Sequence, residues 1–273
     1  MARLTKAQSA TQKKVEQLLA QDILSLSERE YVFQAYHEAA KNNTTVSGAF
    51  FTPLALAEQF AEHCSMPNLS RPVRILDMCA GIGVLSFAVQ QLFNRSHFGE
   101  TCEITCIEIN SDYVEVGQKV VPEATWIQMD VSDVDQLLAL GEFDVVIGNP
   151  PFGNVATFKN KKSLCYTGSN AIFTVAELAA LVSNCATFIM PQQEAGFKYS
   201  GEIKFTDFQN DKLTSFTEQT GIQFIPTNFS GTDLYETQWK AKVPRVEFAE
   251  CDFTGERVSD AHKNLTSQAD LFG

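Results

Sequence analysis

The chain alternates between short apolar runs and longer stretches with helical periodicity. The apolar runs are rich in β-branched residues and lie at 73–77, 103–108, 126–129, 143–148 and 186–190. Such runs are typical of strands buried on both faces of a parallel sheet, and the amphipathic stretches between them predict helices that cover the sheet. We therefore expect an α/β fold, with further strands at 223–229 and 243–251.

The segments at the two ends of the chain differ from this central pattern. Residues 1–44 predict two helices, the first of which has an apolar stripe formed by Val15, Leu18 and Leu19. Ser27 and Glu30 form a capping-box pattern at the start of the second. We expect an N-terminal helical extension at 1–44, a central domain at 45–251 and a flexible tail at 252–273.

Composition narrows the class of protein. The 273 residues are 44% hydrophobic and 20% charged, as in globular proteins with a substantial core. Because we find neither a membrane-spanning apolar run nor an apolar signal region, we expect a cytoplasmic protein. The seven cysteines are scattered, without a Cys-x-x-Cys pair, and the four histidines show no metal-ligand spacing. These patterns favour reduced thiols and no bound metal.

Polar side chains end four successive predicted strands. Asp77, Glu108, Asp130 and Asn149 each follow or close an apolar run. Because the carboxyl ends of parallel strands meet at one edge of a sheet, where open α/β sheets bind ligands, these residues predict a binding site. A carboxylate at Glu108 can accept hydrogen bonds from both hydroxyls of a ribose.

Two further local patterns support a site at this edge. Gly81 and Gly83 follow the first strand and let the backbone pass close to a ligand. After the fourth strand, Pro150 and Pro151 lack N–H groups and fix the backbone, so that the turn at 149–152 is rich in hydrogen-bond acceptors and suits an amino group. Phe152 adds a flat apolar face beside this turn.

The turn Asn149-Pro150-Pro151-Phe152 resembles the catalytic motif of class I S-adenosylmethionine-dependent amino methyltransferases. These enzymes act on adenine N6 in nucleic acid or on a protein glutamine amide. The segment Phe51-Thr52-Pro53 is similar to the turn that in this family lies against the methionine end of the cofactor, although Thr52 and Pro53 also suit the N-cap and first position of a helix.

The resemblance implies a seven-stranded, doubly wound, mostly parallel Rossmann-like sheet, with an antiparallel strand at 243–251. It assigns the four residues of the turn at 149–152 to catalysis. It implies S-adenosylmethionine as cofactor, bound by Phe51, Thr52, Pro53, Asp77, Ala80, Gly81, Gly83, Glu108, Asp130, Val131 and Asn149. Asp130 would accept a hydrogen bond from the adenine amino group of the cofactor, and Val131 would lie alongside its ring.

The substrate is open between three classes. We expect methylation of adenine N6 in DNA, and the alternatives are adenine N6 in RNA and the glutamine N5 of a protein. The net charge of −12 favours a protein substrate, because phosphate contacts normally require a basic surface. Lysines at 159, 161 and 162 follow the catalytic motif and favour DNA. We expect substrate-facing loops at 153–170 and 192–201.

The last residues add a possible partner. Gln268, Asp270, Leu271 and Phe272 resemble the short peptide by which bacterial replication and repair proteins dock on the DNA polymerase sliding clamp. Because Leu271 and Phe272 form a large apolar pair in a polar segment, they suit a peptide-binding groove. This resemblance also favours DNA as the substrate.

Overall fold

The structure is a computed structural model, and it describes residues 6–37, 50–67, 69–95, 101–154 and 164–255. The predicted clamp-binding peptide and the lysines at 159, 161 and 162 lie outside the described residues. Among the helices that the structure describes, none has the length and apolar character needed to cross a membrane.

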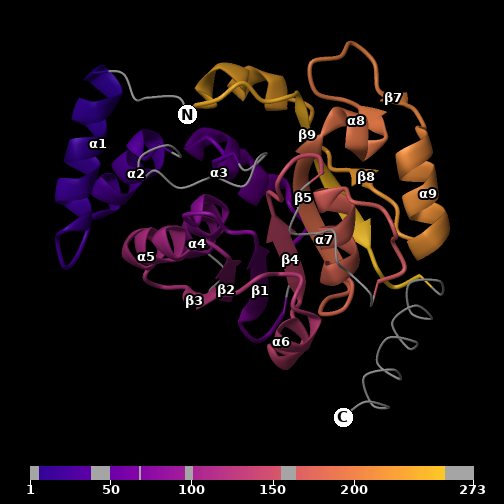
Figure 1. Cartoon of the computed structure of the whole chain (residues 1–273), viewed down its shortest axis with the longest axis horizontal. Helices are drawn as coiled ribbons and strands as arrows, with labels where there is room; N and C mark the ends of the chain where they lie inside the picture. The colour runs from indigo at the N-terminus through magenta and orange to yellow at the C-terminus, as the bar shows by residue number, and fades with distance from the viewer. Residues whose placement is uncertain (1–5, 38–49, 68, 96–100, 155–163, 256–273) are drawn as a thin grey trace.

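A seven-stranded sheet forms the centre of the fold (Figure 1). Its order is β3-β2-β1-β4-β5-β9-β8. The strands are β1 (Val73–Met78), β2 (Cys102–Glu108), β3 (Thr125–Gln128), β4 (Val145–Gly148), β5 (Cys185–Pro191), β8 (Ile225–Pro226) and β9 (Val246–Asp252). Strands β1 to β5 pair in parallel, whereas β9 is antiparallel to both β5 and β8. The predicted fold and its antiparallel strand are confirmed.

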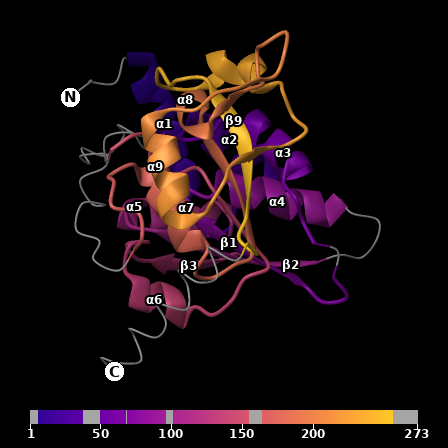
Figure 2. The ribbon, with the colours of Figure 1, turned by 90° about the vertical axis from the view of Figure 1, so that its right-hand side faces the viewer.

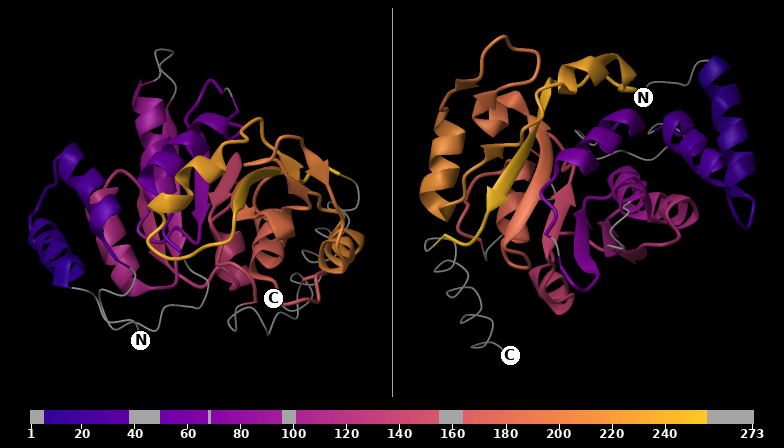
Figure 3. Two further views of the ribbon diagram at one scale, coloured as in Figure 1. Left: turned by 90° about the horizontal axis from the view of Figure 1, so that it is seen from above. Right: turned by 180° about the vertical axis from the view of Figure 1, so that it is seen from behind.

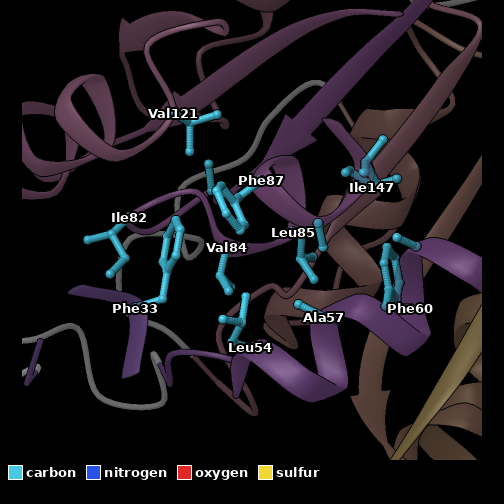
Figure 4. Packing of buried hydrophobic residues seen from close by; sticks show 14 of the residues in the cluster. Phe33, Leu54, Ala57, Phe60, Ile82, Val84, Leu85, Phe87, Val121 and Ile147 are labelled. Atoms are coloured by element: carbon cyan, nitrogen blue, oxygen red, sulfur yellow. The ribbon is translucent and has the colours of Figure 1, made fainter. Parts of the chain in front are cut away.

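Helices cover both faces of this sheet, as Figure 2 shows. One face carries α3 (Leu54–His63), α4 (Val84–Arg95) and α5 (Ser111–Val120). The other carries α6 (Val134–Ala139), α7 (Ala171–Ala179) and α9 (Asp211–Thr220). Successive strand residues point to opposite faces, so Ile75 packs in the first core and Leu76 in the second. Figure 4 shows the first core, where Phe60 of α3 and Leu85 of α4 pack close to Ile147 of β4.

The N-terminal helices α1 (Lys6–Leu19) and α2 (Leu26–Ala35) add to the first core, at the opposite end of the molecule from α9 (Figure 3). Val15 and Phe33 are buried, and the Phe33 ring lies 4.9 Å from that of Phe87 in α4. The capping box of α2 is formed by Ser25 and Glu28, not by the predicted Ser27 and Glu30. The prediction was wrong because the helix begins at Leu26, so Ser27 already lies inside its first turn.

The segment at 192–201, predicted as a loop, is folded. It forms α8 (Gln192–Ala195) and β6 (Phe197–Lys198), which pairs with β7 (Thr206–Asp207). The fully buried carboxylate of Glu247 in β9 holds this segment, because it accepts hydrogen bonds from the Gln192 side chain at 2.7 Å and from the backbone of Tyr199 and Ser200 at 2.8 and 2.9 Å. The partner is distant in sequence, so no local pattern predicted it.

Two predicted strands are shorter than expected. The run at 143–148 forms β4 only from Val145, because Phe143 makes an isolated bridge to Ser183 outside the sheet ladder. The run at 223–229 pairs with β9 only at Ile225 and Pro226. A 3₁₀ helix, η2 (Thr232–Gln238), connects β8 to β9. These differences leave the order of the sheet unchanged.

Candidate functional site

The predicted site residues Asp77, Glu108 and Asn149 lie at the carboxyl ends of β1, β2 and β4. These strands are neighbours, in the order β2-β1-β4, and Met78 pairs with both Ile107 and Gly148. The chain order reverses between β1 and β4, which makes this edge the switch point at which open α/β sheets bind ligands. The structure therefore brings these three residues together at one edge.

The turn after β1 has an unusual backbone. Cys79, Gly81 and Gly83 have φ values of 62°, 58° and 87°. A Cβ at Gly81 would lie 3.2 Å from the Phe51 ring, and one at Gly83 would lie 2.7 Å from Trp126. Both glycines are therefore required for the turn and for its packing against aromatic side chains, in addition to the predicted approach of a ligand.

Glu108 connects this turn to the end of β2. Its two carboxylate oxygens accept hydrogen bonds from the backbone N–H groups of Gly81 and Asn110, each at 2.9 Å. Burial raises the pKa of Glu108, while these N–H donors oppose the shift. A carboxylate has about four acceptor sites, so Glu108 keeps capacity for two hydroxyl donors. These remaining acceptor sites fit the predicted ribose contact.

Asp77 lies beneath the turn. Its Oδ2 accepts a hydrogen bond from the Ser86 hydroxyl at 2.6 Å, and its Oδ1 is buried without a hydrogen-bond partner among the described residues. Burial, with a smaller contribution from the charge of Glu108, raises the pKa of Asp77 to about 7, and the hydrogen bonds from Ser86 oppose this shift. Ser86, in the first turn of α4, was not predicted from the sequence.

Asp130 and Val131 follow β3. Asp130 is half-buried, and its Oδ1 accepts hydrogen bonds from the backbone N–H and the hydroxyl of Ser132 at 2.8 and 2.7 Å. Val131 is buried. These two bonds fix the orientation of the Asp130 carboxylate at the end of its strand.

The Asn149 amide is held in one orientation. Its Nδ2 donates to the backbone carbonyl of Phe50 at 3.0 Å and contacts the hydroxyl oxygen of Thr52 at 2.9 Å. A carbonyl oxygen can only accept, so the nitrogen and not the oxygen must face Phe50. The amide oxygen Oδ1 is buried and has no partner in the part of the chain that the structure describes. Asn149 therefore presents a fixed, unsatisfied acceptor.

The segment at 51–53 leads into a helix, but the N-cap of that helix is not the predicted residue. Helix α3 begins at Leu54, its N-cap is Pro53, and no side-chain hydrogen bond caps it among the described residues. The prediction of Thr52 as N-cap was wrong, because the Thr52 hydroxyl instead accepts from Asn149. Pro53 takes the N-cap position in its place.

Aromatic rings line both sides of this segment. The Phe51 ring lies 5.0 Å from Tyr113 and 5.8 Å from Tyr36, measured between ring centroids. On the other side, the Phe50 ring lies 5.6 Å from that of Phe152. The ring of Phe152, the last residue of the turn at 149–152, therefore packs against the ring of Phe50.

Sequence reasoning missed three contributors to this site, namely Phe50, Ser86 and Trp126. Phe50 acts through its backbone carbonyl, which no side-chain motif reveals. Ser86 of α4 donates to Asp77 of β1, and Trp126 of β3 lies against Gly83 in the turn after β1. Local sequence does not reveal such contacts between separate elements. Among the described residues, no group of three or more His, Cys, Asp or Glu side chains could hold a metal ion.

Comparisons with known proteins concern the family and the fold of the chain. Residues 56–187 match the family described as Methyltransferase small domain. Among solved structures, the chain is similar to a Listeria monocytogenes protein described as a class I S-adenosylmethionine-dependent methyltransferase, with a TM-score of 0.58 and 17% identity over 84% of this chain and 68% of that one.

Two further structures belong to type I restriction-modification systems. One is a modification subunit from Vibrio vulnificus and the other a methyltransferase subunit from Streptococcus thermophilus, each with a TM-score of 0.54 and 14% identity. The alignments cover 86% and 85% of this chain, which spans about half of those chains, 51% and 52%. At these identities the likeness concerns the fold. The family match and the fold together support a class I methyltransferase whose cofactor is S-adenosylmethionine.

Proposed function

We propose that this protein transfers the methyl group of S-adenosylmethionine to the N6 amino group of adenine in DNA. The observation that carries the proposal is the Asn149 amide. Its nitrogen is directed to Phe50 and Thr52, and its buried oxygen lacks a partner among the described residues. A buried acceptor without a donor is costly, and an incoming amino group would satisfy it.

The reaction requires such acceptors because the N6 lone pair of adenine is delocalised into the ring and is a poor nucleophile. In the proposed mechanism, the Asn149 oxygen and the Pro150 carbonyl accept the two N6 hydrogens. This steers the nitrogen toward tetrahedral geometry and its lone pair toward the methyl donor. Phe152 stacks on the base, which leaves the duplex to reach the site. Transfer would be direct, without a covalent enzyme intermediate: the N6–methyl bond would form as the methyl–sulfur bond breaks, the thioether product would leave, and N6 would lose one hydrogen to solvent as a proton.

The residues that would hold the cofactor are those predicted from the family resemblance. We propose that Glu108 binds the ribose hydroxyls, Asp130 the adenine amino group, and the segment at 51–53 the methionine end. When bound, S-adenosylmethionine supplies an electrophilic methyl group on a sulfonium cation. The buried carboxylate of Glu108 gives this edge the acidic surroundings that a cation favours.

DNA is chosen over the other substrates for two reasons. Two proteins of similar fold are a modification subunit and a methyltransferase subunit of type I restriction-modification systems, and the C-terminal peptide resembles a clamp-binding motif. A protein glutamine amide is the second candidate, because the same two acceptors suit an amide nitrogen and the net charge of −12 disfavours phosphate contacts. RNA adenine would use the same catalytic turn.

The direct test measures transfer of labelled methyl groups from S-adenosylmethionine to duplex DNA, to RNA and to a protein extract in parallel. We expect label on adenine N6 of DNA. Label on a protein glutamine or on RNA, without label on DNA, would reject DNA as the substrate.

The variant Asn149→Ala tests the assignment of the catalytic turn. We expect it to abolish methyl transfer while calorimetry still detects cofactor binding, because the amide is assigned to the target nitrogen. Near-normal turnover in this variant would show that the turn has another role.

A further inference from the structure

We propose that Thr52 is a positioning residue for Asn149 and that its hydroxyl holds the amide in the orientation that methyl transfer requires. This inference rests on the proposed function in one respect: it assumes that the Asn149 oxygen accepts a hydrogen bond from the nitrogen that is methylated. It assigns to Thr52 a role at the turn at 149–152, in addition to the cofactor contact expected from the motif at 51–53.

The hydrogen bonds of the Asn149 amide group support this role. Its nitrogen has two hydrogens, and its two partners, the Phe50 carbonyl and the Thr52 hydroxyl, lie at 3.0 and 2.9 Å. Thr52 is 4% exposed, so water is a poor substitute for its hydroxyl. Removal of that oxygen would leave one amide hydrogen unsatisfied and only one bond against rotation of the amide.

The Thr52 hydroxyl has no competing role at the start of α3. A capping threonine would accept a hydrogen bond from an N–H in the first turn of the helix. Instead, Ala57 donates to the backbone carbonyl of Pro53, and the described residues show no side-chain cap. A variant at Thr52 therefore tests the bond to Asn149 without removing a helix cap.

The segment at 50–52 contacts both halves of the site. Phe50 and Thr52 bind the Asn149 amide, whereas the ring of the residue between them, Phe51, packs on the turn at Gly81. Gly81 in turn donates to Glu108, the predicted ribose ligand. One short segment thus lies between the turn assigned to the cofactor and the turn assigned to the methyl acceptor. Its position determines where the acceptor oxygen points relative to the cofactor.

The test uses the full-length protein with Thr52→Val, which removes the hydroxyl and keeps the branched shape, and Thr52→Ser, which keeps the hydroxyl. Thr220→Val is the matched control. Thr220 is also a buried threonine, and it lies in α9, on the opposite face of the sheet from α3. Its hydroxyl donates to the Phe216 carbonyl at 2.8 Å and accepts from the backbone N–H of Ile222 at 3.1 Å. Equilibrium unfolding of all three variants measures the general cost of losing a buried hydroxyl.

Turnover and ligand binding are measured separately. We expect Thr52→Val to lower kcat about tenfold, the effect of one lost hydrogen bond in the transition state. The KM for the acceptor and the Kd for S-adenosylmethionine should change much less than kcat. Thr52→Ser should restore most of the turnover, and Thr220→Val should leave it unchanged.

A second readout does not depend on activity. Hydrogen exchange of the Asn149 side-chain amide, assigned by NMR with Asn149→Ala as reference, should be faster in Thr52→Val than in Thr52→Ser. If wild-type protein methylates none of the three substrates, the proposed function fails and this exchange measurement alone decides the inference. Unchanged amide exchange together with unchanged kcat, or a loss in kcat that Thr52→Ser does not restore, would overturn the role of Thr52.

Discussion

At the scale of single residues, two buried carboxylates dominate the electrostatics of the site. Asp77 and Glu108 both have a pKa that burial raises. The backbone N–H groups of Gly81 and Asn110 support the charged form of Glu108, whereas Asp77, among the described residues, accepts its hydrogen bond from Ser86. Asp77 is therefore the group whose protonation should affect stability most.

The pH dependence of unfolding tests this assignment. The pKa of Asp77 is about 7 in the folded protein and about 3.9 in an unfolded chain. The folded protein therefore keeps a proton that the unfolded chain releases, and this contribution to stability is present below pH ~4 and is lost as pH rises to ~7. The loss is about 1.4 kcal/mol per pH unit within that range.

We expect Asp77→Asn to flatten the fall in unfolding free energy between about pH 4 and 7, as measured by urea unfolding. Glu108, whose pKa burial also raises, keeps its own contribution in this variant. Asp22→Asn, at an exposed position, serves as the control and should leave the wild-type slope unchanged. Equal slopes in wild type and Asp77→Asn would contradict the raised pKa.

The cofactor assignments predict graded losses of affinity. Glu108→Ala should weaken binding of S-adenosylmethionine by about 1.5–3 kcal/mol, the range for hydrogen bonds to a charged group. Asp130→Ala should cost less, because one contact to the adenine amino group is involved. Calorimetry measures both, and unchanged affinity in both variants would require a different position for the cofactor.

At the scale of elements, one buried side chain joins β9 to the segment that contains α8 and β6. Glu247 is fully buried and accepts from Gln192, Tyr199 and Ser200, including the Ser200 hydroxyl at 2.8 Å. Because Gln192 directly follows β5, this network holds the segment near the carboxyl edge of the sheet. The network therefore fixes a segment that the sequence predicted to be a loop.

We expect Glu247→Gln to lower the unfolding free energy by about 2 kcal/mol, because the substituted amide turns a donor toward N–H groups. The amides of Tyr199 and Ser200 should also exchange faster with solvent. Glu236→Gln is the matched control: Glu236 forms an ion pair with Arg245 at 2.7 Å but is 45% exposed, so its loss should cost less than about 1 kcal/mol. Equal effects of the two variants would show that the buried network adds little.

At the scale of the whole molecule, the negative net charge of the protein disfavours binding to DNA. A protein of net charge −12 gains little from phosphate contacts. Recruitment by a DNA-bound partner would compensate, because tethering raises the local concentration of substrate without new contacts at the site. The C-terminal resemblance to a clamp-binding peptide suggests such a partner.

We therefore expect a peptide covering residues 262–273 to bind a bacterial sliding clamp with micromolar affinity, about 8 kcal/mol, in a fluorescence polarisation assay. Replacing Leu271 and Phe272 with alanine should remove binding. The same replacements in the full chain should leave methyl transfer to short oligonucleotides unchanged. Absence of binding up to about millimolar peptide would reject this partner and weaken the argument for DNA.

The sequence by itself determined the strands of the sheet and the polar residues that end them. Asp77, Glu108 and Asn149 were predicted because each follows an apolar run, and the direction of a strand places its last residue at a known edge. The family resemblance added the seven-stranded, doubly wound sheet and the antiparallel β9, whereas the order of the strands came from the structure. These features depend on local patterns or on a known topology.

The tertiary structure alone decided the partners of those residues. The pairing of Thr52 with Asn149, of Asp77 with Ser86 and of Glu247 with the segment after β5 joins separate elements. A serine, threonine or glutamate has several possible hydrogen-bond partners, and only the packing of the helices on the sheet selects one. For the same reason, the sequence could point to the amide of Asn149 but not to the Thr52 hydroxyl that accepts a hydrogen bond from it.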